Sequence, residues 1–222
     1  MSEHRPFSER VRVRRTPHKA RYDPAVIRKF IDEAMFCHVG YAIDGQPMVT
    51  PTMHWRDGEK IYWHGSSASK MLRTVKDAAV CVTVSHMDGL VLARSGMHHS
   101  VNYRSVMVLG RANKVDDAAE KERQLKIFVE RLFPGRWDSL RPATAQELKA
   151  TTVMWTTLSE TSAKIRTGPP ADDEEDYTFP VWAGEIPLRR TAAEPSPCPR
   201  LPQGLEAGAD VAGFLAWMKR GG

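Results

Sequence analysis

The sequence is poor in the residues from which cysteine-based frameworks are built. Its 222 residues include three cysteines, Cys37, Cys81 and Cys198, and no Cys-x-x-Cys pair. This odd set predicts neither a disulfide network nor a thiolate zinc site. No apolar run approaches the roughly 18 residues of a membrane span, and the first residues lack the apolar stretch of a secretory signal. We therefore expect a soluble cytoplasmic protein without a membrane partner.

The glycine-rich signatures of common nucleotide-binding folds are also missing. No Gly-x-Gly-x-x-Gly segment occurs, which argues against a Rossmann dinucleotide site. A small-residue loop does precede Lys70, but Ala68 and Ser69 stand where a Walker loop would carry its second glycine. Nucleotide binding of either kind is not indicated.

Positive charge is confined to one end of the chain. Residues 1–21 hold seven basic residues and two acidic ones, which accounts for the whole formal charge of +5. A globular nucleic-acid-binding protein would be expected to spread a basic face, with interleaved aromatic residues, over its folded part. We predict a basic N-terminal arm at 1–21 and keep nucleic-acid binding as a minor alternative.

Between residues 37 and 115 the pattern is typical of short antiparallel strands. Segments rich in Val, Ile, Thr, Tyr and Trp alternate with Asp44-Gly45, Asp57-Gly58 and Asp88-Gly89, which are two-residue hairpin signals. We expect strands near 37–43, 46–55, 60–64, 79–86, 90–95 and 106–115, and a further β-rich run at 151–158. Tight turns between so many strands favour a mainly β fold, an antiparallel barrel with flanking helices.

Helical patterns interrupt and flank these strands. Asp23-Pro24 predicts the start of a helix that continues to about residue 35, and helices are expected at 69–75 and 117–133. Thr144 and Glu147 have the spacing of a capping box. A central domain at 22–188 is followed at 189–222 by a proline-rich arm, with a short helix predicted from 210 to 219.

The segment from His64 to Lys70 is the strongest candidate for an anion site. A strand there ends in a small-residue loop and a helix begins, so exposed N–H groups and the helix dipole can face a phosphate. Gly65 allows the turn, Ser66 and Ser69 can donate hydroxyl hydrogen bonds, and Lys70 adds a full charge. The plain alternative is that Ser69 caps the helix while Lys70 is solvated.

Seven ordered stretches together resemble the FMN-binding split barrels, in particular the pyridoxamine 5'-phosphate oxidase-like family with its nitroimidazole-reductase-like group. They are Cys-His-Val-Gly at 37–40, Asp-Gly-Gln-Pro at 44–47, Thr-Pro-Thr at 50–52, Tyr-Trp-His-Gly-Ser at 62–66, Asn-Tyr-Arg-Ser-Val at 102–106, Ser-Ala-Lys-Ile-Arg-Thr-Gly-Pro-Pro at 162–170 and Pro-Val-Trp-Ala-Gly at 180–184. The resemblance covers residues 12–188 and implies an antiparallel split β-barrel.

The resemblance also implies a cofactor, FMN, and a homodimer with FMN at the interface. It implies that four residues of one strand, Val49, Thr50, Pro51 and Thr52, lie along the flavin ring, and that Ser69 and Lys70 hold its phosphate. It places Tyr103, Arg104 and Ser105 beside the cofactor or the subunit boundary. Lys164, Arg166 and Trp182 would approach from the partner subunit. Each of three of these residues also has a purely structural interpretation: Thr50 as a strand residue, Arg166 as a surface charge and Trp182 as a core aromatic.

The eight histidines do not form a metal-binding pattern. A turn at Asp57-Gly58 would place Arg56 opposite Glu59, and the resulting register puts His54 and His64 on opposite sides of the sheet. We therefore predict no metal site. His64 precedes the phosphate loop and is a weak candidate for a catalytic role, against a neutral packing role.

One departure from the family limits the prediction of substrate. Pyridoxamine phosphate oxidases carry an Arg-x-His-Asp-Arg type segment near the C-terminus, and here the chain passes from Trp182 into the proline-rich arm without one. We expect an FMN-dependent oxidoreductase acting on a small flat acceptor and not on pyridoxamine 5'-phosphate. The alternative is an FMN- or haem-binding module without turnover.

Overall fold

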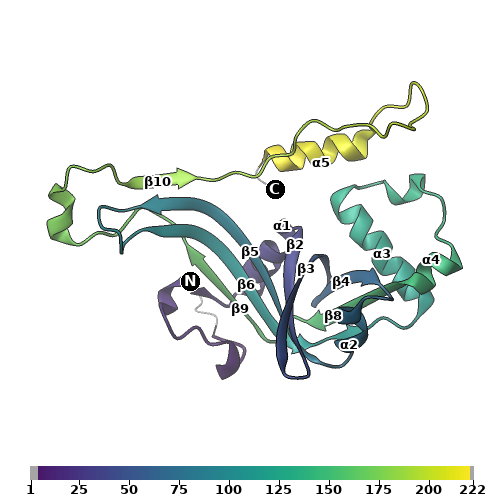
Figure 1. The fold of residues 1–222 in the computed structure, drawn as a ribbon, viewed down its shortest axis with the longest axis horizontal. Helices are drawn as coiled ribbons and strands as arrows, with labels where there is room; N and C mark the ends of the chain where they lie inside the picture. The colour runs from purple at the N-terminus through teal and green to yellow at the C-terminus, as the bar shows by residue number, and fades with distance from the viewer. Residues whose placement is uncertain (1–4, 221–222) are drawn as a thin grey trace.

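The computed structural model describes residues 5–220 and shows one twisted antiparallel sheet wrapped into an open barrel (Figure 1). Neighbouring strands follow the order β1-β9-β6-β5-β2-β3-β4-β8-β7, and β10 pairs separately with β5. The strands are β1 (Ala20–Arg21), β2 (Phe36–Ile43), β3 (Gln46–Asp57), β4 (Lys60–Ser66), β5 (Ala79–Leu92), β6 (Ser100–Arg111), β7 (Asn113–Lys114), β8 (Thr151–Thr157), β9 (Thr161–Arg166) and β10 (Gly184–Pro187). The predicted antiparallel split β-barrel is confirmed.

The three Asp-Gly pairs have three different outcomes. Asp44 and Gly45 form the predicted two-residue turn, with φ values of 50° and 80° between the paired residues Ile43 and Gln46. Asp57 instead pairs with Lys60, so the predicted register between β3 and β4 was wrong, and His54 lies opposite Trp63. His54 and His64 still point to opposite faces, because the shift preserves their parity.

The predicted hairpin at Asp88-Gly89 does not exist. β5 runs straight through this pair, with a register shift between Met87 and Gly89. A side chain at Gly89 would meet the Ile186 carbonyl oxygen at 3.0 Å, so the glycine permits the close approach of β10. The two strands predicted on either side of the pair are therefore one long strand.

The sheet has two unequal faces, which we call the inner face and the outer face. The inner face carries alternate residues of β2, β5 and β6 into the main core; these include Val39, Val82, Val84, Val106 and Val108, all fully buried. The helix α1 (Pro24–Glu33) packs over one end of this core through Ile27, Phe30 and Ile31. The outer face has no such cover from the described chain.

The helices begin where the sequence predicted. Asp23 accepts a hydrogen bond from the Ala25 N–H and Pro24 occupies the first turn of α1. Thr144 and Glu147 form the full capping box of α4 (Ala145–Ala150). The long helix α3 (Ala118–Leu132) and α4 lie together on the right of Figure 1, over the part of the sheet formed by β4 and β8, while α2 (Lys70–Thr74) is short.

Both predicted arms contact the rest of the chain, the second mainly through its terminal helix. In the first arm Val11 is buried and β1 pairs with β9; residues 1–4 lie outside the described part. The second arm crosses above the barrel in Figure 1 and ends in α5 (Ala209–Lys219), where Phe214 packs against Phe133. The predicted helix is confirmed, and residues 221–222 are not described. Within residues 5–220, no helix combines the length and the apolarity needed to cross a bilayer.

Candidate functional site

The outer face carries five of the residues expected to contact a flavin, which are Val49, Pro51, Tyr103, Ser105 and Lys164. Cross-strand pairing aligns Pro51, His38 and Thr83 in one row, and Thr83 continues the row to Met107. Directly paired residues share a face. By this rule, and by the alternation along each strand, the outer face consists of Phe36, His38, Val49, Pro51, Thr83, Ser85, Met87, Tyr103, Ser105, Met107 and Lys164.

Two of the four expected ring-contacting residues point the other way. Thr50 pairs with the buried Val39 and Thr52 pairs with the buried Cys37, so both threonine side chains face the inside of the barrel. The Thr50 hydroxyl lies 3.0 Å from the Tyr41 hydroxyl. A ligand on the outer face would meet the side chains of Val49 and Pro51, and only the backbone of the two threonines.

The expected residues of β6 and β9 are likewise divided. Ser105 pairs with Lys164 on the outer face. Arg104 turns inward, where its guanidinium donates to both Asp88 and Glu33. These hydrogen bonds raise the pKa of Arg104, and the Asp88 bond is the main cause. Arg104 is therefore held away from Tyr103 and Ser105.

Arg166 is engaged within its own chain. Its guanidinium donates to the Gly168 and Pro169 carbonyl oxygens at 2.7 and 2.9 Å, and to the Asn102 side-chain oxygen. Gly168 has a φ of +98°, so the arginine ties down a turn that a glycine makes possible. In this arrangement Arg166 holds the segment leading to Trp182.

The two halves of the expected flavin site are far apart within one chain. Pro51 in β3 and Lys164 in β9 are separated by the three intervening strands β2, β5 and β6. Four strand spacings correspond to roughly 19 Å along the sheet, further than one isoalloxazine ring reaches. A ring lying over Pro51 would therefore not reach Lys164 of the same chain.

The predicted phosphate loop has fewer free N–H groups than the sequence suggested. The N–H of Ser67 donates to the Ala150 carbonyl, and those of Ala68 and Ser69 donate to the hydroxyl and the carbonyl of Ser66. Ser69 precedes α2 without a side-chain cap hydrogen bond. The first turn of α2 keeps its N–H groups available, as helix starts do. Lys70 is exposed and makes no ion pair within residues 5–220.

His64 lies on the face of β4 that α3 covers. Its ring is 4.7 Å from the Phe128 ring and 5.8 Å from the Trp55 ring, measured between centroids. Burial lowers its pKa, so the imidazole is neutral near pH 7. Its Nδ1 is buried and has no hydrogen-bond partner. This is a packed histidine with an unused nitrogen, and it does not face the phosphate loop.

An apolar cavity of about 400 Å³ lies between α3, α4 and β8, and His64 is not one of its lining residues. Thr151 in its wall pairs with Ser66, two residues beyond His64, and Leu125 in its wall lies one helical turn before Phe128. The remaining lining is supplied by Trp137, Leu140, Arg141, Ala143, Glu147 and Leu148. Arg141 and Glu147 form an ion pair at this cavity. No sequence pattern predicts this cavity, because its lining comes from α3, the segment 137–143, α4 and the start of β8, which only folding brings together.

Large apolar side chains remain exposed on and beside the outer face. Trp182 is 63% exposed and Val49 is 65% exposed, which is unusual for residues of their type. Others nearby in the sheet or in the late segment are Phe36, Met48, Met87, Leu90, Phe179, Val181 and Ile186. An apolar surface of this extent is typical of an interaction site.

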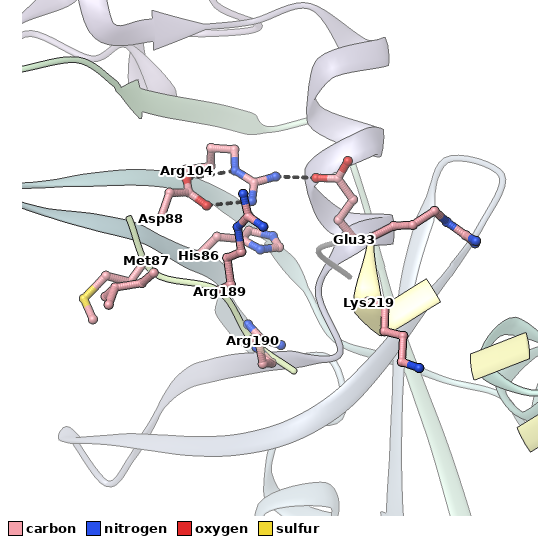
Figure 2. A pocket seen from close by; sticks show the side chains of 10 residues that line it. Glu33, His86, Met87, Asp88, Arg104, Arg189, Arg190 and Lys219 are labelled. Carbon is pink, nitrogen blue, oxygen red and sulfur yellow. Dashed lines mark hydrogen bonds and ion pairs between the residues drawn. The ribbon is translucent and has the colours of Figure 1, made fainter. Parts of the chain in front are cut away.

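A second cavity, of about 300 Å³, lies beneath the C-terminal arm (Figure 2). The arm residues Arg189 and Arg190 line it together with Lys219 and Arg220 from the end of α5. His86, Met87, Asp88 and Arg104 form its sheet side, with Glu33 from α1. No sequence signal pointed to this cavity, because the arm residues are basic residues in a segment that composition predicts to be a linker.

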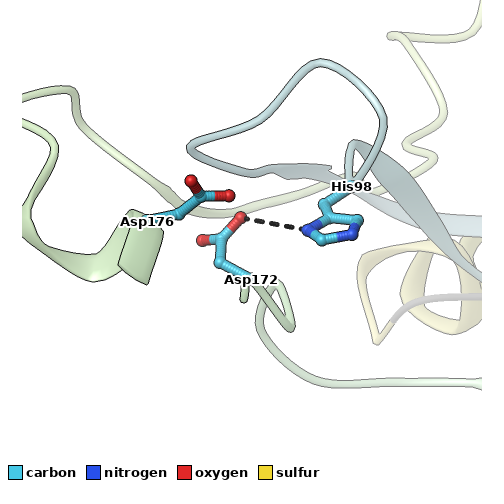
Figure 3. Close-up of side chains that lie close together, drawn as sticks. All are labelled: His98, Asp172 and Asp176. Carbon is cyan, nitrogen blue, oxygen red and sulfur yellow. Dashed lines mark ion pairs between the residues drawn. The ribbon is translucent and has the colours of Figure 1, made fainter. Parts of the chain in front are cut away.

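A third cluster links the β5–β6 loop to the late segment. His98, Asp172 and Asp176 each offer a ligand atom, and these atoms lie within 4.8 Å of one another (Figure 3). Asp172 already accepts hydrogen bonds from the backbone N–H and the guanidinium of Arg94. Arg94 balances the negative charge of Asp172, so this ion pair fastens the late segment to the residues that follow β5.

Comparisons with known proteins agree with this architecture. Residues 23–165 match the family model for pyridoxamine 5'-phosphate oxidase. The structure of the flavocytochrome Anf3 from Azotobacter vinelandii is 45% identical, with a TM-score of 0.91, and the match covers 94% of this chain and 98% of that one. A search of curated proteins found no match.

Two further structures extend the comparison. The FAD- and haem-binding protein from Mycobacterium smegmatis is 30% identical, with a TM-score of 0.85, over 89% of this chain and 97% of that one. A candidate 5-nitroimidazole antibiotic resistance protein from Bacteroides thetaiotaomicron VPI-5482 is 21% identical over 66% of this chain and 86% of that one, with a TM-score of 0.54, and shares the fold. The family match spans more than half of the chain, and the first two structural matches cover 94% and 89% of it. The chain therefore belongs to the pyridoxamine 5'-phosphate oxidase family.

Proposed function

We propose that this protein is a homodimeric flavocytochrome, a redox protein that holds a flavin on the outer face and a haem beside His64. The observation that carries the proposal is the full-length similarity, at 45% identity, to a flavocytochrome. The open apolar outer face and the unused nitrogen of a neutral buried histidine support it independently.

The chemical types of the groups on the outer face match those that a flavin needs. Val49 and Pro51 offer a flat apolar surface, and the backbone of β3 offers polar groups to the ring heteroatoms. Ser69, Lys70 and the start of α2 would hold the phosphate that FMN and FAD share. FMN is the smallest ligand that meets these contacts, and acid extraction followed by chromatography distinguishes it from FAD.

The surroundings of His64 suit a haem in kind. A histidine binds haem iron through a neutral imidazole nitrogen, and His64 has its pKa lowered by burial and keeps Nδ1 unpaired, so it would be able to hold the iron. The cavity between α3, α4 and β8 would supply an apolar wall through Leu125, Trp137 and Leu140. Arg141 at the same cavity would pair with a propionate if Glu147 released it.

A second copy of the chain would complete the flavin site. Val49 and Lys70 of one protomer would hold the flavin, while Lys164 and Trp182 of the partner would cover it. The exposed apolar side chains listed for the outer face would be buried in that dimer. Light scattering should give about twice the chain mass of 25.0 kDa.

When bound, the flavin would exchange electrons with a donor in pairs and with the haem singly. The chain's own residues bind, orient and shield. Lys164 would stabilise negative charge on the reduced ring by its own positive charge. Arg166, which is held by carbonyl oxygens, positions the segment carrying Trp182 and leaves the flavin's charge to Lys164.

Oxidation of pyridoxamine 5'-phosphate is not part of this proposal, since the C-terminal segment of true oxidases has no counterpart after Trp182. A phosphorylated vitamer would need its own cations at the ring, and Arg104 and Arg166 are both committed to other partners. Small flat electron-poor acceptors that stack on the ring remain the expected substrates.

The absorption spectrum of the purified full-length protein tests the proposal. Two visible flavin bands and a Soret band are expected together. His64→Ala should lose or shift the Soret band and keep the flavin bands, whereas His99→Ala, on an exposed loop histidine, should change neither. A spectrum with flavin alone would contradict the haem half, and a colourless protein that takes up no added flavin would contradict the whole.

A further inference from the structure

Four basic side chains gather around the cavity beneath the C-terminal arm, which we call the arm cleft. Arg189 and Arg190 follow β10, and Lys219 and Arg220 end α5. None of the four side chains has a hydrogen bond or an ion pair with residues 5–220. In Figure 2 the two arginines lie on one side of the cleft and Lys219 lies on another.

The acidic residues of the arm cleft do not neutralise this charge. Asp88 and Glu33 are both bound to Arg104, the fifth cation of the lining. His86 adds no charge near pH 7, because burial lowers its pKa; its Nε2 bonds to the Phe30 carbonyl. With two carboxylates and five cations, the cleft carries a net charge of three positive units.

Such a concentration of like charge is unfavourable in the free chain. Cations that share a small, partly enclosed cavity repel one another, and the low-dielectric walls strengthen that repulsion. The four basic residues are exposed and come from two segments 29 residues apart. A bound anion would relieve the repulsion, and the neighbouring Arg189 and Arg190 suit a ligand with two adjacent anionic groups.

The arm cleft lies at the edge of β5 between its pairings with β2 and β10, has mainly inner-face residues on its sheet side, and is distinct from the phosphate loop. Met87 lines the cleft and also lies on the outer face, where it pairs with Tyr103. In Figure 1 α2, with Lys70, lies at the lower end of the barrel, while the arm crosses the upper side. A single flavin phosphate cannot occupy both positions. At about 300 Å³ the cleft holds a diphosphate with part of its sugars, and the rest of the ligand would extend over Met87.

We infer that the arm cleft binds the diphosphate of a dinucleotide whose other end reaches the outer face. This inference rests on the proposed function for the redox site that the dinucleotide would reach. The diphosphate has two possible sources. It belongs either to a soluble nicotinamide dinucleotide that brings electrons, or to the adenylated half of the flavin itself.

The test uses the purified full-length protein with its cofactors and inorganic pyrophosphate as the probe. Calorimetric titration should show binding to the wild type that weakens steeply with salt. Arg189→Gln/Arg190→Gln should weaken it at least about tenfold, because each charge-assisted contact to an oxyanion contributes roughly a factor of ten or more. Lys219→Gln should weaken it less. Arg200→Gln removes one charge from an exposed part of the same arm and should leave the affinity unchanged.

The flavin content of the same variants identifies the source. If the cleft variant keeps its flavin and binds NADH or NADPH more weakly, the diphosphate is that of a soluble donor. If it loses flavin, and pyrophosphate releases flavin from the wild type, the diphosphate is that of FAD. Equal pyrophosphate affinity and equal flavin content in the cleft variant and the wild type would overturn the inference. Failure of the proposed function would show separately, as the absence of flavin and Soret bands.

Discussion

The inner and outer faces of the sheet are built from the same strands but differ in burial: side chains on the inner face are buried and many on the outer face are exposed. On the inner face the alternate residues of β2, β5 and β6 are fully buried against α1 and the opposite wall of the barrel. On the outer face the intervening residues include Val49 and Met87, both more than half exposed. The inner face is therefore completed within one chain, whereas the described residues leave the outer face open, and we propose that a flavin and a second chain cover it.

The two faces contribute to different properties of the protein: the inner face to folding stability and the outer face to association and ligand binding. Residues that complete the core determine whether the barrel forms, and their removal should cost folding free energy. Apolar residues left in water contribute little to the folding of one chain but favour association or ligand binding. Substitutions on the two faces should therefore affect different measurements.

The largest expected effect compares two tryptophans. Trp63 is fully buried in the main core and Trp182 is 63% exposed. Trp63→Ala should lower the free energy of unfolding by about 3–5 kcal/mol, while Trp182→Ala should change it by less than about 0.5 kcal/mol. Urea titrations measure both. Trp182→Ala should instead lower the flavin content and weaken the dimer; equal destabilisation by the two substitutions would abolish the distinction between the faces.

A buried histidine of the inner side should make stability depend on pH. His54 is fully buried and its pKa is lowered to about 4, mainly by burial and then by the charge of Arg131. The unfolded chain takes up this proton near pH 6.5, so folding stability is complete above that pH. It should fall by roughly 3 kcal/mol as the pH drops to about 4.

His54→Gln separates this effect from general acid denaturation. Glutamine can still donate to the Ile31 carbonyl, which lies 3.0 Å from the His54 Nε2, and it does not titrate. Urea titrations at pH 7 and pH 4.5 should show a smaller loss of stability in the variant than in the wild type. Identical losses would mean that other groups, His64 and His86 among them, account for the pH dependence.

A smaller effect is expected at the phosphate loop. Lys70→Ala removes one charge-assisted contact to the flavin phosphate and should weaken flavin binding by about 1.5–3 kcal/mol, with no change in the stability of the flavin-free fold. Fluorescence titration with FMN and with FAD gives the affinity. Lys76→Ala, on the exposed turn after α2, is the matched control. Equal flavin affinity in the two variants would remove Lys70 from the site.

Much of this comparison could be predicted from the sequence. The β-favouring residues of 37–43 and 79–86 predicted the strands, and local chemistry at Asp23, Asp44 and Thr144 predicted caps and a turn correctly. The Asp88-Gly89 signal misled because the glycine there serves the close approach of β10, a contact distant in sequence. The shifted turn after Asp57 shows that Asp-Gly pairs do not by themselves fix a register.

The candidate site was less predictable for a physical reason. The resemblance placed four consecutive residues, 49–52, along the flavin ring. Alternation along β3 instead sends the side chains of Thr50 and Thr52 to the inner face. Three features depend on segments that only folding brings together. They are the ion pairs of Arg104, the cavity between α3, α4 and β8, and the arm cleft. No spacing within the sequence carries that information.

The central claim is that one flavin site is built from two chains, and a mixed dimer tests it most directly. Lys70→Ala and Trp182→Ala chains, co-expressed with different affinity tags, give a heterodimer that tandem purification isolates. If Lys70 and Trp182 serve one site from opposite chains, one site of the heterodimer is intact and the other carries both changes. The account predicts about one flavin per heterodimer, well above either variant homodimer. A flavin content no higher than that of the variant homodimers would mean that each site lies within a single chain.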